Sequence, residues 1–284
     1  MNYRMIWKAA AIVACSAGLL LAQGQTQGGA APQGQAAQPA APPPGSPVAP
    51  QPQVKSPKEA QAVMAIVNAQ NPDDRIKAAN ELVSNFADSE FKSLALFFAA
   101  VSYQQKNDAD RTIVYAERTL EADKTHYQAM LMLAGLIASR TREFDLDREE
   151  KLKAAEGYAA KALEILKTAP RPNPNITDEQ WESAKKDFNS QAHESFAMAA
   201  MARNQPDKAI EEFKISMSTA TMSDPTTGVR LAAAYSKAEK YDDAIATLDK
   251  ILAAQDLHPQ VKQIATAERN RAVQLKQKGA APAK

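Results

Sequence analysis

Apolar residues recur every three or four positions along most of the chain, and residues 224–253 show this pattern most clearly. Asp224 is a suitable helix N-cap, and Pro225 can take the first helical position, where a missing N–H costs nothing. A turn at 237–242 then separates two stretches of helical periodicity. The two predicted buried stripes consist of Leu231, Ala232 and Tyr235, then Ala244, Leu248, Ile251 and Leu252. The stretch therefore predicts two short helices joined by a tight turn.

The same pattern returns at a period close to 34 residues, which is the mark of a repeat protein. Counted back from Ala232, Tyr235, Ala244, Leu248 and Leu252, the matching positions are Ala197, Ala200, Ala209, Phe213 and Met217; Ala100, Tyr103, Thr112, Ala116 and Leu120; and Ile66, Ala69, Ala78, Leu82 and Phe86. Another copy starts at Ala134 and Ile137, and its second-helix residues arrive nine positions late. Five units are thus predicted, of which the third contains an insertion.

At these positions the chain resembles the tetratricopeptide repeat (TPR) family, in the form of an exported bacterial member. The resemblance covers residues 59–258. It departs from the family where Leu96 and Gly228 replace an aromatic residue, and where Lys124 and Lys167 replace a proline. The resemblance implies an all-α fold, a right-handed α-solenoid of about five TPR-like helix–turn–helix units with a C-terminal capping helix. A non-repetitive helical bundle is the alternative.

Composition agrees with an all-α globular chain and excludes some partners. Of the 284 residues, 45% are hydrophobic and 24% charged, which is ordinary for a globular protein, and the net charge is +1. No basic patch with interleaved aromatic residues is present, so we expect no nucleic-acid partner.

The first 22 residues have the form of an export signal. Arg4 and Lys8 precede an apolar run that ends at Ala22, a plausible cleavage site. Fourteen apolar residues are too few to span a bilayer, so we expect no membrane insertion after cleavage and a periplasmic or secreted protein. Two alternatives stay open, an uncleaved anchor and a lipid anchor through Cys15, the only cysteine.

The remaining chain divides at changes of composition. Residues 23–56 contain Gln, Ala, Pro and Gly with few large apolar side chains, which cannot offset the entropy of ordering. Thr177 begins a long helix with Trp181 on its core face. The predicted organisation is a signal peptide at 1–22, a disordered linker at 23–56, units one to three at 57–169, a Pro-rich break at 170–176, units four and five at 177–258, a capping helix at 259–278 and a disordered tail at 279–284.

No catalytic or metal-binding motif stands out. The histidines His126, His193 and His258 have no second ligand at helical spacing, and phosphate-binding or nucleophile motifs are absent. The acidic residues of the insertion, 140–150, lack the glycine and terminal glutamate of a calcium loop. We therefore expect no enzyme activity, no cofactor and no metal.

The TPR resemblance implies that the first helix of each unit lines a concave, mainly apolar face. Projected onto this chain, the partner-binding groove consists of Val63, Val67, Leu94, Phe97, Val101, Gln104, Leu131, Glu194, Met198, Met201, Val229 and Ser236. We expect an exported scaffold that binds a protein or peptide there and mediates protein–protein interaction in the cell envelope. The alternatives are a structural subunit or homo-oligomer that buries this face, a lipid-anchored envelope-assembly factor, and simple packing of these side chains against neighbouring helices.

Overall fold

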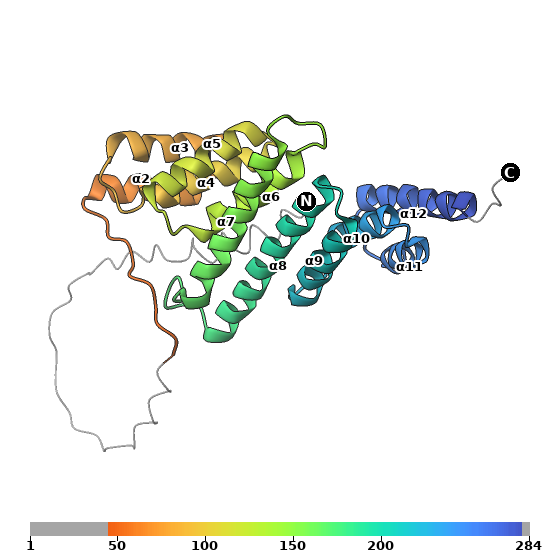
Figure 1. The fold of residues 1–284 in the computed structure, drawn as a ribbon. Helices are drawn as coiled ribbons and strands as arrows, with labels where there is room; N and C mark the ends of the chain where they lie inside the picture. The colour runs from red at the N-terminus through yellow and green to blue at the C-terminus, as the bar shows by residue number, and fades with distance from the viewer. Residues whose placement is uncertain (1–44, 280–284) are drawn as a thin grey trace, which may run out of the picture.

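A computed structural model describes residues 45–279, and within that range the regular structure is helical (Figure 1). The helices are α2 (Pro57–Asn68), α3 (Pro72–Asn85), α4 (Lys92–Gln105), α5 (Ala109–Ala122), α6 (Tyr127–Arg140), α7 (Arg148–Thr168), α8 (Asp178–Ala202), α9 (Pro206–Thr219), α10 (Pro225–Lys237), α11 (Tyr241–Leu252) and α12 (Pro259–Gly279). The predicted signal peptide, Cys15, most of the linker and residues 280–284 lie outside the described residues.

The helix starts follow the capping signals in the sequence. Ser56, Asn71 and Asp224 each accept a backbone N–H from the first turn of the helix that follows, and a proline occupies that turn. Thr177 and Gln180 form a reciprocal capping box at the start of α8. These side chains satisfy N–H groups that have no partner inside the helix, which fixes the starts of α2, α3, α8 and α10.

The helices form five consecutive hairpins and a terminal cap. In Figure 1 they follow one another from α2 to α12 as an open stack. Among the described residues, the substantial helix contacts join only helices adjacent in sequence or one apart, and the buried side chains fall into successive clusters instead of one central core. The predicted all-α solenoid of helix–turn–helix units with a capping helix is confirmed, and the closed-bundle alternative is wrong.

Three of the hairpin turns share one backbone geometry. Asn107, Asn204 and Glu239 have positive φ angles of 57°, 59° and 61°. Each sits between the two helices of its unit, and the residue after it donates its backbone N–H to a carbonyl five residues back, as Lys240 does to Tyr235 at 2.9 Å. The left-handed residue thereby caps the first helix and reverses the chain.

Ion pairs at the repeat period join each unit to the next. The second residue of every second helix is acidic, and it meets a cation at or near the end of the following first helix or of the cap. These five pairs, which we call the inter-unit ladder, are Asp73–Lys106, Asp110–Arg140, Glu149–Arg203, Asp207–Lys240 and Asp242–Lys276. The ladder persists through the third unit although its insertion lengthens the spacing.

The middle of the solenoid is enlarged. Helices α7 and α8 have 21 and 25 residues, whereas those of the first two units have 12 to 14. The connection between them is held by Trp181, which is 1% exposed and donates its indole N–H to the carbonyl of Ala169 at 3.1 Å. Tyr127 and Phe188 pack edgewise or tilted around the same ring. Trp181 is therefore a core residue at the joint between the third and fourth units.

Residues 45–53, which composition places in a disordered linker, follow a defined path here. Pro47 and Ala49 exchange backbone hydrogen bonds with Arg171, both at 2.8 Å. The Arg171 guanidinium also donates to the Ser46 and Ile176 carbonyls and pairs with Asp178. The structure differs from the prediction because the α7–α8 connection offers unpaired backbone groups and an arginine to this segment, which we call the N-terminal strap.

Candidate functional site

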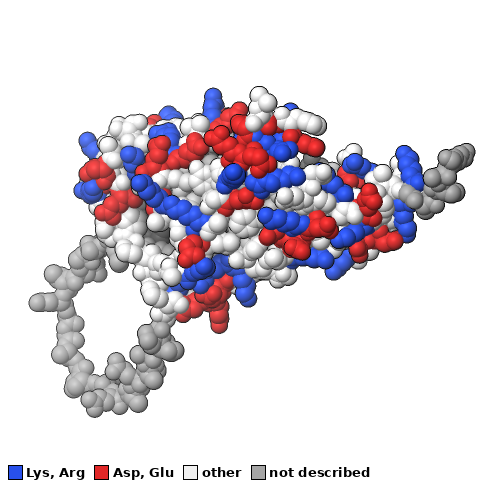
Figure 2. All heavy atoms as spheres, in the orientation of Figure 1, with Lys and Arg blue, Asp and Glu red and all other residues white. Residues whose placement is uncertain are grey.

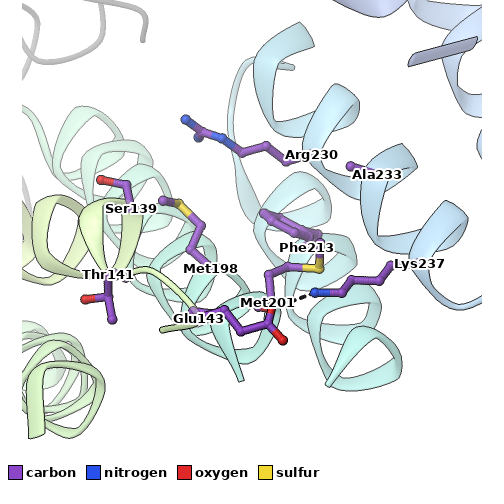
Figure 3. A pocket seen from close by; sticks show the side chains of 11 residues that line it. Ser139, Thr141, Glu143, Met198, Met201, Phe213, Arg230, Ala233 and Lys237 are labelled. Atoms are coloured by element: carbon purple, nitrogen blue, oxygen red, sulfur yellow. Dashed lines mark hydrogen bonds between the residues drawn. The ribbon is translucent and has the colours of Figure 1, made fainter. Parts of the chain in front are cut away.

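An open groove of about 360 Å³ lies where the first helices of units three, four and five meet. In Figure 3, α6 and the loop after it form one wall, α8 supplies the floor, and α10 forms the opposite wall. The residues around the groove are Ala138, Ser139, Thr141, Glu143, Met198, Met201, Ala202, Phe213, Arg230, Ala233 and Lys237. Its volume falls within the range of ordinary ligand sites.

The floor of the groove is apolar and adaptable. Met198 and Met201 are half-buried and lie one helical turn apart on α8, while Phe213 from α9 is almost fully buried beneath them. Methionine side chains are unbranched and polarizable, so they fit apolar groups of different shapes. The floor is therefore suited to apolar side chains of varied form.

The two cations of the α10 wall differ in their surroundings. Arg230 pairs with Glu194 of α8, a partly buried ion pair that fixes its guanidinium. Lys237 is exposed and donates one long hydrogen bond, 3.5 Å, to the Met201 carbonyl (Figure 3). It forms no ion pair within residues 45–279. Lys237 is thus the cation at this groove that remains able to meet an anionic group.

The insertion forms the other wall as an ordered loop, residues 141–147. Thr141 donates to the Ile137 carbonyl at 2.8 Å, and Arg148 donates to the Glu143 carbonyl at 2.9 Å. Asp145 accepts the Arg142 backbone N–H at 3.1 Å, and this bond, with Lys151 nearby, lowers the pKa of the Asp145 carboxyl. The insertion is thus a charge-paired turn.

This loop carries two large apolar side chains that the sequence reasoning passed over. Phe144 is 89% exposed and Leu146 is 107% exposed. The alternation of acidic and apolar residues in Glu143–Asp147 could have revealed them, because an apolar residue inside a polar insertion has no repeat neighbour to pack on. Both lie beside Thr141 and Glu143, which line the groove.

The twelve groove residues projected from the sequence have three kinds of environment. Val63, Phe97, Val101, Gln104, Leu131 and Val229 are buried between helices. Val67, Leu94 and Ser236 are half-buried, and Glu194 is half-buried in its pair with Arg230. Met198 and Met201 are the members that line the groove of Figure 3. The wider lining stays a prediction, while these two residues share one defined cavity.

The three histidines lie apart from one another and serve local contacts. His126 accepts the Ala129 backbone N–H at its Nδ1 atom and stacks on Phe97 at 4.6 Å. Burial lowers the His126 pKa to about 4, since a charged imidazole would lose its water there. His193 contacts Glu212 at 2.6 Å. No group of three or more metal-binding side chains occurs among residues 45–279.

Surface charge gives no sign of a polyanionic or polycationic partner on the face shown. Figure 2 shows basic and acidic side chains interspersed along the whole stack, without an extended area of one sign. Much of this mixture is paired, as in the inter-unit ladder. Within the described part of the chain, none of the helices combines the length and apolar character needed to cross a bilayer.

Comparison with known proteins gives structural likenesses only. No protein-family model and no curated protein matches the chain. Among solved structures, a thermophilic TPR protein of Thermus thermophilus, TTC0263, is 15% identical over 69% of this chain and 90% of its own, with a TM-score of 0.46. The assembly chaperone of RpL4, Acl4, is 13% identical over 78% of this chain and 97% of its own, with a TM-score of 0.39. The TPR domain of P58(IPK) is 13% identical over 78% of this chain and 65% of its own, with a TM-score of 0.30. The fold assignment rests on the hairpins of the chain itself.

Proposed function

We propose that the chain is a protein-binding scaffold that takes an apolar segment of another protein into the groove between α6, α8 and α10. The observation that carries this proposal is the methionine floor, Met198 and Met201, open on the first-helix side of three successive units. No step of the proposal requires the scaffold to perform chemistry on its partner.

The groove favours a partner segment with apolar side chains next to an acidic group. Apolar side chains of the partner would displace water from Met198 and Met201, which favours binding in proportion to the area buried. An acidic group would meet Lys237 at the rim, where a charge complementary to it improves specificity and association rate. A basic segment would lack that contact.

We place this scaffold in the cell envelope, exported by the signal at residues 1–22. The support is the sequence alone, with Arg4 and Lys8 before the apolar run and a Gln/Ala/Pro-rich stretch after it. Mass spectrometry of the N-terminus of the protein isolated from cells tests the location. A mature N-terminus at Gln23 supports cleavage by signal peptidase, an acylated Cys15 supports the lipid anchor, and an intact Met1 in the cytoplasmic fraction contradicts export.

Site-specific photocrosslinking tests the binding itself. A photoreactive residue placed at Ala233, in the groove wall, should trap a partner protein in intact cells, whereas one at Val114 on α5 should not. The trapped segment, made as a peptide, should then bind the purified chain. Binding should be lost in Met198→Asp and kept in Val114→Asp. Equal binding by both variants would contradict the groove as the site.

A further inference from the structure

The insertion loop displays two apolar side chains to water, although the loop itself is ordered. Phe144 and Leu146 have the greatest exposure of the large hydrophobic residues in the described range, ahead of Met222 at 62% and Val114 at 49%. An exposed phenylalanine forgoes the stabilisation that burial would give it. Neighbouring exposed apolar residues mark interaction sites more often than isolated ones do.

Hydrogen bonds fix the loop in this display. Asp145 bridges the backbone of Arg142 and the ammonium of Lys151, which also contacts Asp147 at 2.9 Å. Arg148 ties the far end of the loop to the Glu143 carbonyl. Since the polar side chains hold the turn closed, the backbone that carries Phe144 and Leu146 is already in place, which lowers the entropy cost of binding.

The loop and the groove have complementary surfaces. The loop alternates apolar and acidic residues, Glu143 to Asp147, and the groove combines a methionine floor with the exposed Lys237. The loop cannot fill its own groove, because it forms the wall of that groove and its two apolar side chains are exposed. Both surfaces lie side by side, so two copies related by a two-fold axis can exchange loops.

We propose that the Phe144 side chain of one copy enters the groove of a second copy, which returns its own Phe144, so that a symmetric dimer forms. Leu146 then covers the floor beside it. Glu143, the acidic residue of the loop that is not engaged with Lys151, faces Lys237 of the other copy. The inference rests on the proposed binding groove and names its occupant when no partner protein is present. Dimer formation and partner binding are therefore mutually exclusive.

The contact is small, so the dimer dissociates readily. An aromatic side chain buries roughly 150–250 Å², and two loops with their groove walls would bury on the order of 500 Å² per copy. That is below the ~800 Å² per partner of a standard stable interface. A reversible association of this kind leaves the groove available to a tighter ligand.

Sedimentation equilibrium of the full chain tests the dimer. We expect a mass that rises from one copy to two across about 1 to 100 μM, the range in which a small interface exchanges. Phe144→Asp should weaken the self-association at least tenfold. Val114→Asp, which places the same charge on another exposed apolar residue, should leave it unchanged. A single-copy mass throughout, a mass that grows beyond two copies, or equal loss in both variants would overturn the proposal.

A disulfide between copies tests the geometry, because Cys15 is the only native cysteine. In a Cys15→Ser background, a copy carrying Leu146→Cys, which keeps Phe144, is mixed with a copy carrying Ala233→Cys. We expect a mixed disulfide between the two, suppressed by Met198→Asp in the copy that carries Ala233→Cys. No mixed disulfide, or a Phe144-dependent association with anionic lipid vesicles in place of a dimer, would overturn the inference. A monomeric chain that still binds the trapped peptide at Ala233 would leave the proposed function standing.

Discussion

The first two units and the middle of the solenoid are built from the same hairpin, but only the middle departs from the repeat. Helices α2 to α5 have 12 to 14 residues, and short turns join them. Between residues 141 and 202 the chain inserts a loop, extends two helices to 21 and 25 residues and adds the proline-rich connection. Everything that could act on a partner, the loop and the groove, lies in or next to this irregular part.

The difference shows what a repeat does and does not determine. In a regular unit each side chain packs against an equivalent neighbour, so the same small and large residues suffice, as Ala99 and Leu82 do in the first cluster. A helix longer than its neighbours projects past them and needs its own contacts. Trp181, Arg171 and the N-terminal strap supply these contacts at one end of α8. At its other end α8 keeps the register of the repeat, and the partly uncovered Met198 and Met201 form the groove floor.

The largest effect should come from removing Trp181. Trp181→Ala deletes the largest fully buried side chain at the joint, and such substitutions cost about 3–5 kcal/mol. The ring joins α7, α8 and α6. Its loss should therefore let the helices before the joint and the helices after it unfold separately. Denaturant unfolding followed by circular dichroism should change from one transition to two, and hydrogen exchange should become faster around the joint first.

Leu82→Ala is the matched control for the regular part. Leu82 is fully buried, and its loss should cost about 2–5 kcal/mol, a similar amount. The difference should lie in where the protein opens, since the first hairpin would loosen while the joint stays closed. If Trp181→Ala still unfolds in one transition with an unchanged denaturant slope, Trp181 does not couple the unfolding of the units on the two sides of the joint.

The second effect concerns His126, where the regular part meets the middle. The lone pair of its Nδ1 atom accepts the Ala129 N–H at the start of α6, and burial holds its pKa at about 4, below the ordinary 6.5. Above pH 6.5 the ring is neutral in both the folded and the unfolded chain, so His126 makes its full contribution to the free energy of unfolding. As the pH falls toward 4 the unfolded chain takes up the proton first, so up to about 3 kcal/mol is lost. Thermal unfolding between pH 7 and 4 measures this.

His126→Asn provides the control, because asparagine can cap α6 without titrating. This variant should lose the part of the acid dependence that lies between pH 6.5 and 4, while its stability at pH 7 stays close to that of the parent. An unchanged pH profile in His126→Asn would show that other groups carry the acid sensitivity.

The fold could be predicted from the sequence because the same spacing of small and large apolar residues recurs in five units. The 34-residue period predicted the order of the hairpins, and the caps at Thr177 and Asp224 predicted the starts of α8 and α10. The strap was not predictable from composition. Residues 45–53 are ordered by unpaired backbone groups of the α7–α8 connection, which lie more than 120 residues away in sequence.

The site could be predicted only in part, for a geometric reason. Helical spacing identifies which residues share a face, as it does for Met198 and Met201, which line one groove. It cannot tell how deeply the next unit covers that face, and Phe97, Val101 and Leu131, which share the predicted lining, are buried between neighbouring helices. The exposed Phe144 escaped notice because an insertion has no counterpart in the other units.

A smaller effect, of opposite sign, is expected at the turn of the last unit. Glu239 has a φ of 61°, a conformation that costs a residue with a Cβ atom about 1 kcal/mol and costs glycine almost nothing. Glu239→Gly should therefore raise the free energy of unfolding by up to about 1 kcal/mol. The same change at Asn107 should give less, since asparagine tolerates this region. The test is to measure the thermal unfolding midpoints of the two variants and the parent side by side. Equal shifts in the two variants, or a lower midpoint in Glu239→Gly, would contradict the assignment of strain.

The smallest effects should come from single pairs of the inter-unit ladder, and they should differ between the two regions. Asp73 and Lys106 form an exposed pair between the first two units, so Asp73→Asn should lower the thermal midpoint slightly and only at low salt. At the enlarged junction Arg203 is 14% exposed and meets both Glu149 and Glu156, and hydrogen bonds to these carboxylates raise its pKa. Glu156→Gln should therefore have the larger effect, and that effect should persist in high salt, because a partly buried pair is screened less. Midpoints at low and high salt for both variants provide the measurement. If the midpoints of the two variants respond to salt alike, the ion pairs of the enlarged junction stabilise it no differently from those of a regular junction. The two regions would then differ in helix length and not in how their units are joined.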